Sequence, residues 1–180
     1  MKVQIVYTSL TGCTKKLAQA IYDGLPTDNK SIHDLKDGIP TLDGDIVLLG
    51  YWSINGGPCE EMQDVLKTVT GKAVGVFCTL GYYADSAYGY KTLETAINLL
   101  KDRNEIIGSY ICNGKVAQHL IDGQSKGGNP VPTEQKELRW EMIKNHPTQA
   151  ECALGAERFR ERIHMYARSQ ELNIPFQSIL

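Results

Sequence analysis

The segment YTSLTGCTKKLA, residues 7–18, places hydroxyl side chains between an apolar run and an amphipathic pattern. Ser9, Thr11 and Thr14 can each donate a hydrogen bond, and Gly12 lets the backbone approach a ligand closely. Where a strand runs into a helix, the first helical amides and the helix dipole favour an anion. Helix capping explains any one of these hydroxyls. Three of them with a glycine at one turn predict a phosphate site formed mostly by neutral donors.

Other phosphate-binding motifs do not fit this sequence. It contains no GxxxxGK[ST] and no GxGxxG after a strand, which disfavours a nucleotide triphosphatase and a dinucleotide fold. Cys13 lies at an expected helix start, where a thiolate would be stabilised. However, a phosphatase loop needs an arginine to clamp the phosphoryl group, and the segment ends on Gln19 instead. We therefore expect Cys13 to present its backbone amide, and we predict no catalytic residue.

Short apolar runs alternate with helical patterns in the first 112 residues. Continuous apolar runs are typical of strands buried on both faces. Strands separated by helices pair in parallel, with helices on both faces of the sheet. The pattern predicts a doubly wound α/β fold with a five-stranded parallel sheet. Its strands are expected at 3–7, around Ile32, and at 46–49, 73–78 and 105–112, with helices over 17–25, 62–69 and 93–100.

The C-terminal third differs in composition. Residues 113–132 are polar and glycine-rich, which predicts a surface excursion, and we assign it no secondary structure. TEQKELRWEMIKNH after it is expected to be helical. A last helix is expected to begin at Thr148, with Glu151 completing a capping box. Its apolar stripe comprises Cys152, Ala156, Phe159, Ile163 and Tyr166. We expect residues 1–180 to form a single domain.

Charge and cysteine content limit the possible partners. The 180 residues carry 19 basic and 21 acidic side chains without a long run of either sign, so nucleic acid is not an expected partner. The N-terminus resembles neither a signal peptide nor a membrane span, which predicts a cytoplasmic protein with no membrane partner. The five cysteines are far apart and no histidine has metal-site spacing, so we expect reduced thiols and no metal.

The hydroxyl segment also carries a family motif. SLTGCT matches [ST]-x-T-G-x-T at every specified position, and the sequence resembles the flavodoxin family over roughly its first 112 residues. DIVLLG followed by a glycine-containing loop, and DSAY after the fourth strand, extend the resemblance. The tail HPTQAECALGAERF looks like that of flavodoxin-like proteins in anaerobic bacteria. The resemblance implies bound FMN and electron transfer, with the phosphate held by Ser9, Leu10, Thr11, Gly12, Cys13 and Thr14.

The flat flavin ring needs two apolar or aromatic walls and polar atoms at its edge. The loops expected after the third and fourth strands, 51–57 and 79–90, are rich in aromatic residues. The resemblance implies that they supply Trp52, Ser53, Ile54, Asn55, Gly56, Thr79, Leu80, Gly81, Tyr82 and Tyr88 to the pocket.

Two positions in this pocket have alternative assignments. The family's frequent inner tryptophan falls on Ile54, whereas Trp52 either fills the core or lies at the edge of the flavin. For the outer face, DSAY selects Tyr88, but Tyr82 is nearer the strand end.

The pair Asn55-Gly56 suggests a way to control the redox potential. In the family, a peptide in this loop turns over on one-electron reduction and accepts a hydrogen bond from flavin N5. Asn and Gly visit positive φ more easily than other residues, although Asn-Gly is also a common turn pair. No charged residue lies between Thr8 and Thr14, and Lys15 and Lys16 are expected to point to solvent. An uncompensated phosphate would oppose the second electron and lower the second potential.

Three functions remain open. The first is an FMN-binding electron carrier that serves a partner reductase. The second is an FMN-dependent NAD(P)H oxidoreductase acting on a quinone or another small acceptor. The third is a flavodoxin-fold binding module without flavin, which the intact SLTGCT disfavours. Flavodoxins that shuttle electrons are strongly acidic, whereas this chain has a net charge of only −2. Its partner interface is therefore expected to be less electrostatic, and the 113–132 excursion and the C-terminal helices are candidate docking sites.

Overall fold

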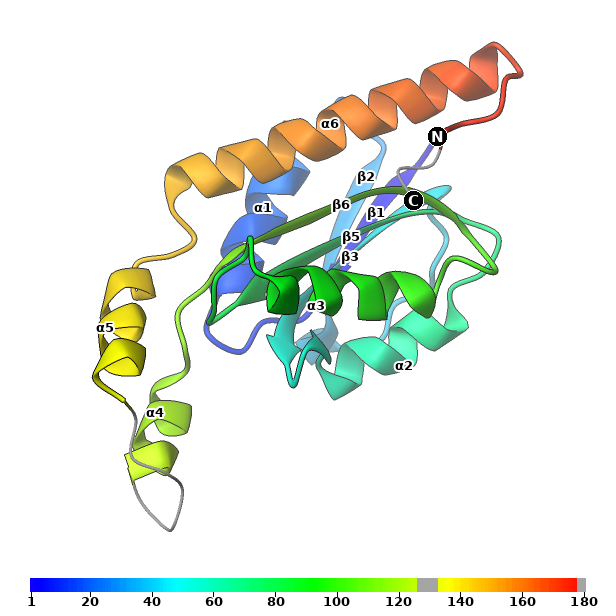
Figure 1. Cartoon of the computed structure of the whole chain (residues 1–180). Coiled ribbons are helices and arrows are strands. Elements are labelled where there is room, and N and C mark those ends of the chain that lie inside the picture. Colours follow the sequence, from blue (N-terminus) through cyan, green and yellow to red (C-terminus); the bar gives the residue numbers. More distant parts are fainter. Residues whose placement is uncertain (126–132, 178–180) are drawn as a thin grey trace.

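The computed structural model describes residues 1–125 and 133–177. Five parallel strands form the sheet in the order β2-β1-β3-β5-β6 (Figure 1). The strands are β1 Val3–Tyr7, β2 Lys30–Asp34, β3 Ile46–Ile54, β5 Ala73–Leu80 and β6 Glu105–Asn113. This confirms the predicted doubly wound α/β fold.

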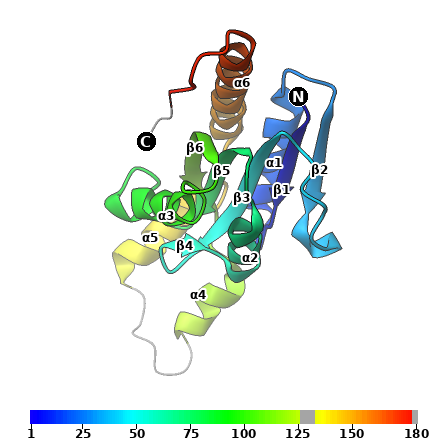
Figure 2. The same ribbon diagram turned by 90° about the vertical axis from the view of Figure 1, so that its right-hand side faces the viewer.

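Helices cover both faces of the sheet (Figure 2). On one face α1, Cys13–Gly24, and α6, Gln149–Glu171, pack on the strands. On the other face lie α2, Glu60–Thr68, and α3, Ala87–Asn98. Phe159 of α6 is fully buried and meets Phe77 of β5 edge to face, with ring centroids 6.1 Å apart. These contacts fix α6 on the central strands.

The predicted capping box at the start of α6 is present. Thr148 accepts a hydrogen bond from the Glu151 amide, and the Glu151 carboxylate accepts one from the Thr148 amide. The same carboxylate lies 2.7 Å from Nδ1 of His146. Burial raises the pKa of Glu151, but the hydrogen bonds from Thr148 and His146 outweigh it, so this pKa is lowered overall.

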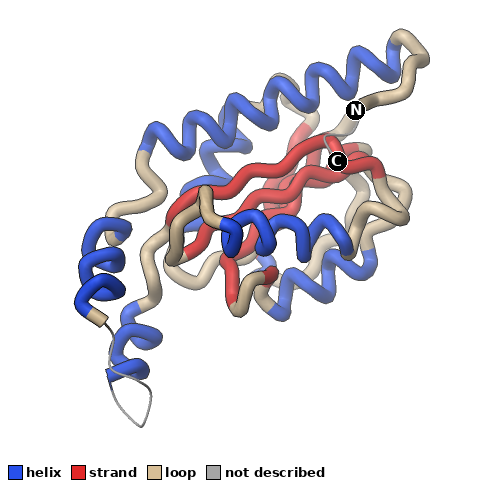
Figure 3. Tube along the Cα trace, in the orientation of Figure 1, coloured by secondary structure: helices blue, strands red, loops and turns tan. Residues whose placement is uncertain are grey.

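Two predictions about loops are wrong. Residues 51–54 belong to β3, which pairs with the short antiparallel strand β4, Gly57–Pro58, in a tight hairpin. The excursion contains a helix, α4, Gln118–Ser125, and its residues 126–132 lie outside the described part of the chain. The helix expected next is α5, Glu134–Ile143. Figure 3 shows α4 and α5 extending past the end of the sheet where β6 stops.

One short 3-10 turn, η1 at Leu35–Asp37, completes the described elements. In the described part of the chain, no helix is long and apolar enough to cross a membrane.

Candidate functional site

The hydroxyl segment forms the connection between β1 and α1. Gly12 has φ 85°, which a residue with a side chain adopts only with strain, and it directly precedes the helix. Among the described residues no side chain caps α1, so the alternative that these hydroxyls serve as caps does not hold. The first amides of a helix lack partners within the helix. The turn therefore directs backbone donors toward an anion site.

The three hydroxyls have different surroundings. Ser9 is only 4 % exposed, and its Oγ has no hydrogen-bond partner among the described residues. The Thr14 hydroxyl is fully buried and lies 2.9 Å from that of Thr79 at the end of β5. Thr11 is partly exposed and faces the neighbouring cavities. Ser9 is thus a buried donor without an acceptor.

The β3–β4 hairpin forms the second part of the site. Ile54 pairs with Gly57, so Asn55 and Gly56 are the only two turn residues. Their φ values are 52° and 77°, as a type I′ hairpin turn requires. The Gly56 carbonyl accepts a hydrogen bond from Thr95 at 3.2 Å. In this structure Asn55 and Gly56 therefore form an ordinary hairpin turn, which is the simpler of the two interpretations of this pair.

Tyrosines after β5 lie against that turn. A Cβ added at Gly56 would lie 3.4 Å from the ring of Tyr88. The rings of Tyr88 and Tyr82 meet edge to face, with centroids 5.6 Å apart. Asn113, at the end of β6, holds the Tyr82 carbonyl with a 2.7 Å hydrogen bond. Both tyrosines proposed as stacking residues thus belong to one aromatic cluster.

A cavity of about 410 Å³ brings most of the predicted residues together at the carboxyl ends of the strands. Ligands of doubly wound sheets bind at this edge. The predicted residues that line it are Leu10, Thr11, Trp52, Ser53, Ile54, Asn55, Thr79, Leu80, Gly81, Tyr82 and Tyr88. Trp52 lines the cavity and also packs against the core under α2 and α3, so its place at the edge of a flavin stays a prediction.

The other predicted residues lie around this cavity. Gly12 and Cys13 line an adjoining hollow of about 230 Å³. Ser9 and Thr14 lie buried under the loop, and the Gly56 backbone lies behind Tyr88. A larger cavity of about 770 Å³ lies at the amino ends of β5 and β6, and no predicted site residue lines it.

Sequence reasoning missed one wall of the cavity. This wall comes from the β6–α4 connection and from α5, and it consists of Gly114, Lys115, Val116, Ala117, Leu120, Lys136, Arg139 and Trp140. Lys136 and Arg139 are three residues apart and therefore share one face of α5. Trp140, which follows this pair in an otherwise charged segment, was the sequence feature that could have indicated a buried face of α5.

Basic side chains also lie around the phosphate loop. Lys16, Lys115, Lys144 and His146 line the hollow beside Gly12. Lys16 donates a 2.5 Å hydrogen bond to the Pro147 carbonyl, which holds the Lys16 side chain beside the loop. Residues 8–14 carry no charged side chain, but segments distant in sequence bring Lys115 and Lys144 beside the loop. These two lysines weaken the argument that the second electron is taken up at a low potential.

The sequence matches the flavodoxin domain family over residues 4–159. The chain belongs to this family of FMN-binding flavoproteins. It is 40% identical to the flavodoxin-like domain-containing protein BilS of Clostridioides difficile over 124 residues, which cover 67% of this chain and 70% of BilS.

Solved structures support the same fold. A flavodoxin of Fusobacterium nucleatum bound to flavin mononucleotide aligns with a TM-score of 0.57 and 14% identity, over 93% of this chain and 98% of that chain. The rubredoxin oxygen:oxidoreductase of Desulfovibrio gigas aligns with a TM-score of 0.57 and 17% identity, over 95% of this chain. This flavodoxin domain spans only 36% of that longer protein.

Residues of this flavodoxin domain fit the parts of FMN. The unpaired Ser9 hydroxyl, the uncapped start of α1 and the nearby lysines suit a phosphate. The aromatic side chains around the larger cavity suit a flat ring. The assignment of individual residues to FMN remains a prediction.

Burial shifts the pKa of several thiols of the flavodoxin domain upward. Burial raises the pKa of Cys59 to about 12 and raises that of Cys78, Cys112 and Cys152. All five cysteines are free and buried. Cys13 donates a hydrogen bond to the His146 carbonyl at 3.3 Å, which links α1 to the segment before α6.

Proposed function

We propose that this flavodoxin domain binds FMN and carries electrons to a partner protein. The observation that supports it most strongly is the convergence of three segments on one cavity: the SLTGCT loop, the Asn55-Gly56 turn and the Tyr82–Tyr88 cluster. When bound, FMN would supply the redox chemistry, since it accepts and donates electrons one or two at a time.

The protein side chains bind and orient the cofactor. Amides at the start of α1, with the Ser9 hydroxyl, would hold the phosphate. The Asn55-Gly56 peptide lies between two residues at positive φ, so it can take more than one orientation at the edge of the cavity. Such a turn adjusts its hydrogen bonding to the ring at modest conformational cost.

An accessible edge of the site supports a carrier. Leu10, Ile54 and Tyr88 all line the cavity, and each is about 40 % exposed. Apolar side chains at the rim let a partner protein approach closely without burying charges. A redox partner, either a reductase or an electron donor, would dock over this rim.

The two tryptophans allow a direct test of cofactor binding. The chain has only Trp52 and Trp140, and both line the cavity. Adding FMN should quench the fluorescence of the protein in a saturable way, and Trp52→Phe and Trp140→Phe should each retain part of the quenching. No quenching and no retention of FMN on a desalting column would contradict the proposal.

The alternative is an FMN-dependent oxidoreductase that takes electrons from NAD(P)H and reduces a small acceptor. Lys115, Lys136 and Arg139 on the cavity wall favour it, because they could attract the negatively charged phosphates of NAD(P)H. Oxidation of NAD(P)H by the FMN-loaded protein with a quinone, and without any second protein, would identify this function. Slow turnover that depends on an added reductase would identify the carrier.

A further inference from the structure

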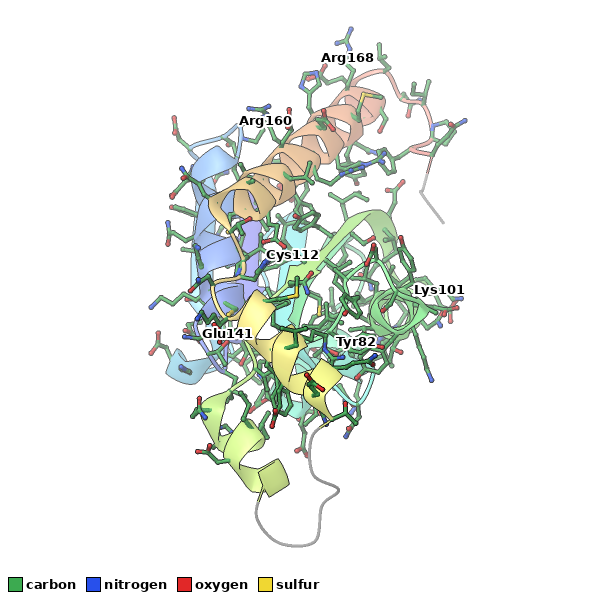
Figure 4. The ribbon with its side chains drawn as sticks, turned by 60° about the vertical axis from the view of Figure 1, so that its left-hand side comes forward. Tyr82, Lys101, Cys112, Glu141, Arg160 and Arg168 are labelled. Carbon is green, nitrogen blue, oxygen red and sulfur yellow. The ribbon has the colours of Figure 1, made fainter. Side chains whose placement is uncertain are left out.

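Arg139 of α5 is fixed over the aromatic cluster of the cavity. Its guanidinium carbon lies 4.5 Å from the centroid of the Tyr82 ring and 5.8 Å from that of Tyr83. Stacking of a guanidinium on an aromatic face is favourable and restricts the arginine. Figure 4 shows Tyr82 beside α5, at the end of the sheet.

The hydrogen bonding of Arg139 is incomplete. Its Nε is buried and has no hydrogen-bond partner among the described residues. A buried donor without a partner is unfavourable, more so when the group is charged. Among the described residues that line the cavity none is acidic, and Glu137 and Glu141 border a separate hollow on α5. A ligand in the cavity that carries an acceptor atom would satisfy this donor.

We propose that Arg139 is a flavin-binding residue that binds the reduced ring more tightly than the oxidised ring. This inference rests on the proposed binding of FMN. The ring presents hydrogen-bond acceptors along one edge, and it gains a negative charge when it takes up two electrons and one proton. A cation in a site sheltered from water interacts strongly with such a charge. Arg139 would then raise the two-electron potential of the bound flavin.

A purely structural role predicts a different result. If Arg139 only attached α5 to Tyr82, its loss would affect the oxidised and reduced complexes equally, and the potential would stay the same. The ratio of the two dissociation constants therefore separates binding of the reduced flavin from attachment of the helix.

The experiment compares Arg139→Gln, Arg139→Lys and Arg160→Gln, each as the full chain loaded with FMN. Arg160 is an exposed α6 residue paired with Glu157, so its replacement removes the same charge far from the cavity. Dithionite reduces each protein in equilibrium with a dye of known potential, and fluorescence titration gives the affinity for oxidised FMN. Thermal unfolding without FMN shows whether each variant folds.

For Arg139→Gln we expect reduced FMN to lose at least tenfold more affinity than oxidised FMN. This corresponds to a midpoint potential about 30 mV lower for a two-electron couple. Arg139→Lys should keep the charge and show a smaller shift, and Arg160→Gln should show none. An unchanged potential in folded, FMN-loaded Arg139→Gln would overturn this inference alone. Failure of the wild-type protein to bind FMN would overturn the proposed function together with it.

Discussion

The side-chain oxygens of Thr14 and Thr79 lie 2.9 Å apart, and both residues are buried. This contact joins the first turn of α1 to the end of β5 beneath the phosphate loop. Replacing either threonine by valine leaves the other hydroxyl buried without this partner, which costs about 1–3 kcal/mol. We expect Thr14→Val and Thr79→Val each to lower the free energy of unfolding by such an amount in chemical denaturation.

The double variant provides the control. Removing both hydroxyls leaves neither unsatisfied, so the double variant should lose less stability than the sum of the two single losses. Strictly additive losses would show that the two hydroxyls do not interact.

Replacing Ser9 should weaken FMN binding without lowering the stability of the fold. Because its buried Oγ has no partner in the described structure, Ser9→Ala should not lower the stability of the protein without FMN. It should weaken FMN binding roughly tenfold to a hundredfold, since a hydrogen bond to a charged group contributes about 1.5–3 kcal/mol. Fluorescence titration and thermal unfolding measure the two effects.

Ser31 offers a matched comparison. Its Oγ is also buried without a hydrogen-bond partner among the described residues, but it lies on β2, outside the cavity. Ser31→Ala should leave FMN affinity unchanged. Equal affinities of Ser9→Ala and Ser31→Ala would remove Ser9 from the phosphate site.

The sheet was predictable because whole strands are buried. Residues 46–49 of β3 are completely buried, and so they show as an unbroken apolar run. The start of α6 was predictable from a local rule, since Thr148 and Glu151 are three residues apart. The hairpin was missed although Asn55-Gly56 is the typical signal for it, because the flavodoxin resemblance suggested a loop there.

The wall formed by α5 could not be predicted in this way. The helix exposes Leu138 and Met142 while it buries Trp140 and Ile143, so apolar periodicity does not indicate its inner face. Arg139 meets Tyr82 only through the tertiary fold. Lys115 and Lys144 likewise lie near the phosphate loop only through the tertiary fold, so the sequence did not indicate them.

Replacing Gly56 tests whether the conformation of the hairpin turn affects FMN binding. Its φ of 77° strains any side chain, and a new Cβ would contact the Tyr88 ring. Gly56→Ala should lose about 1–2 kcal/mol of stability and should also change FMN affinity and potential. Gly71 has φ 65° with no atoms within 4 Å of the added Cβ, and it lies at the opposite end of the sheet. Gly71→Ala should lose stability alone, whereas equal effects on FMN would exclude a specific role of the turn.

The lowered pKa of Glu151 makes the stability of the protein depend on pH. Its pKa is lowered in the folded protein because the Thr148 and His146 hydrogen bonds outweigh the effect of burial. A carboxylate whose folded pKa is depressed stabilises the protein above its unfolded pKa, and this stabilisation is lost as the pH falls through the folded value.

Glu151→Gln separates the charge from the cap, because glutamine can still accept the Thr148 amide. The variant should be less stable than the wild type at neutral pH. The two melting temperatures should converge as the pH falls below the ordinary glutamate pKa and through the lower pKa of Glu151 in the folded protein, where the wild-type carboxylate becomes protonated. Thermal unfolding across this range measures the difference, with the exposed Glu141→Gln as control, whose melting temperature should stay close to the wild type throughout. A constant gap between wild type and Glu151→Gln at all pH values would show that the charge of Glu151 does not stabilise the start of α6.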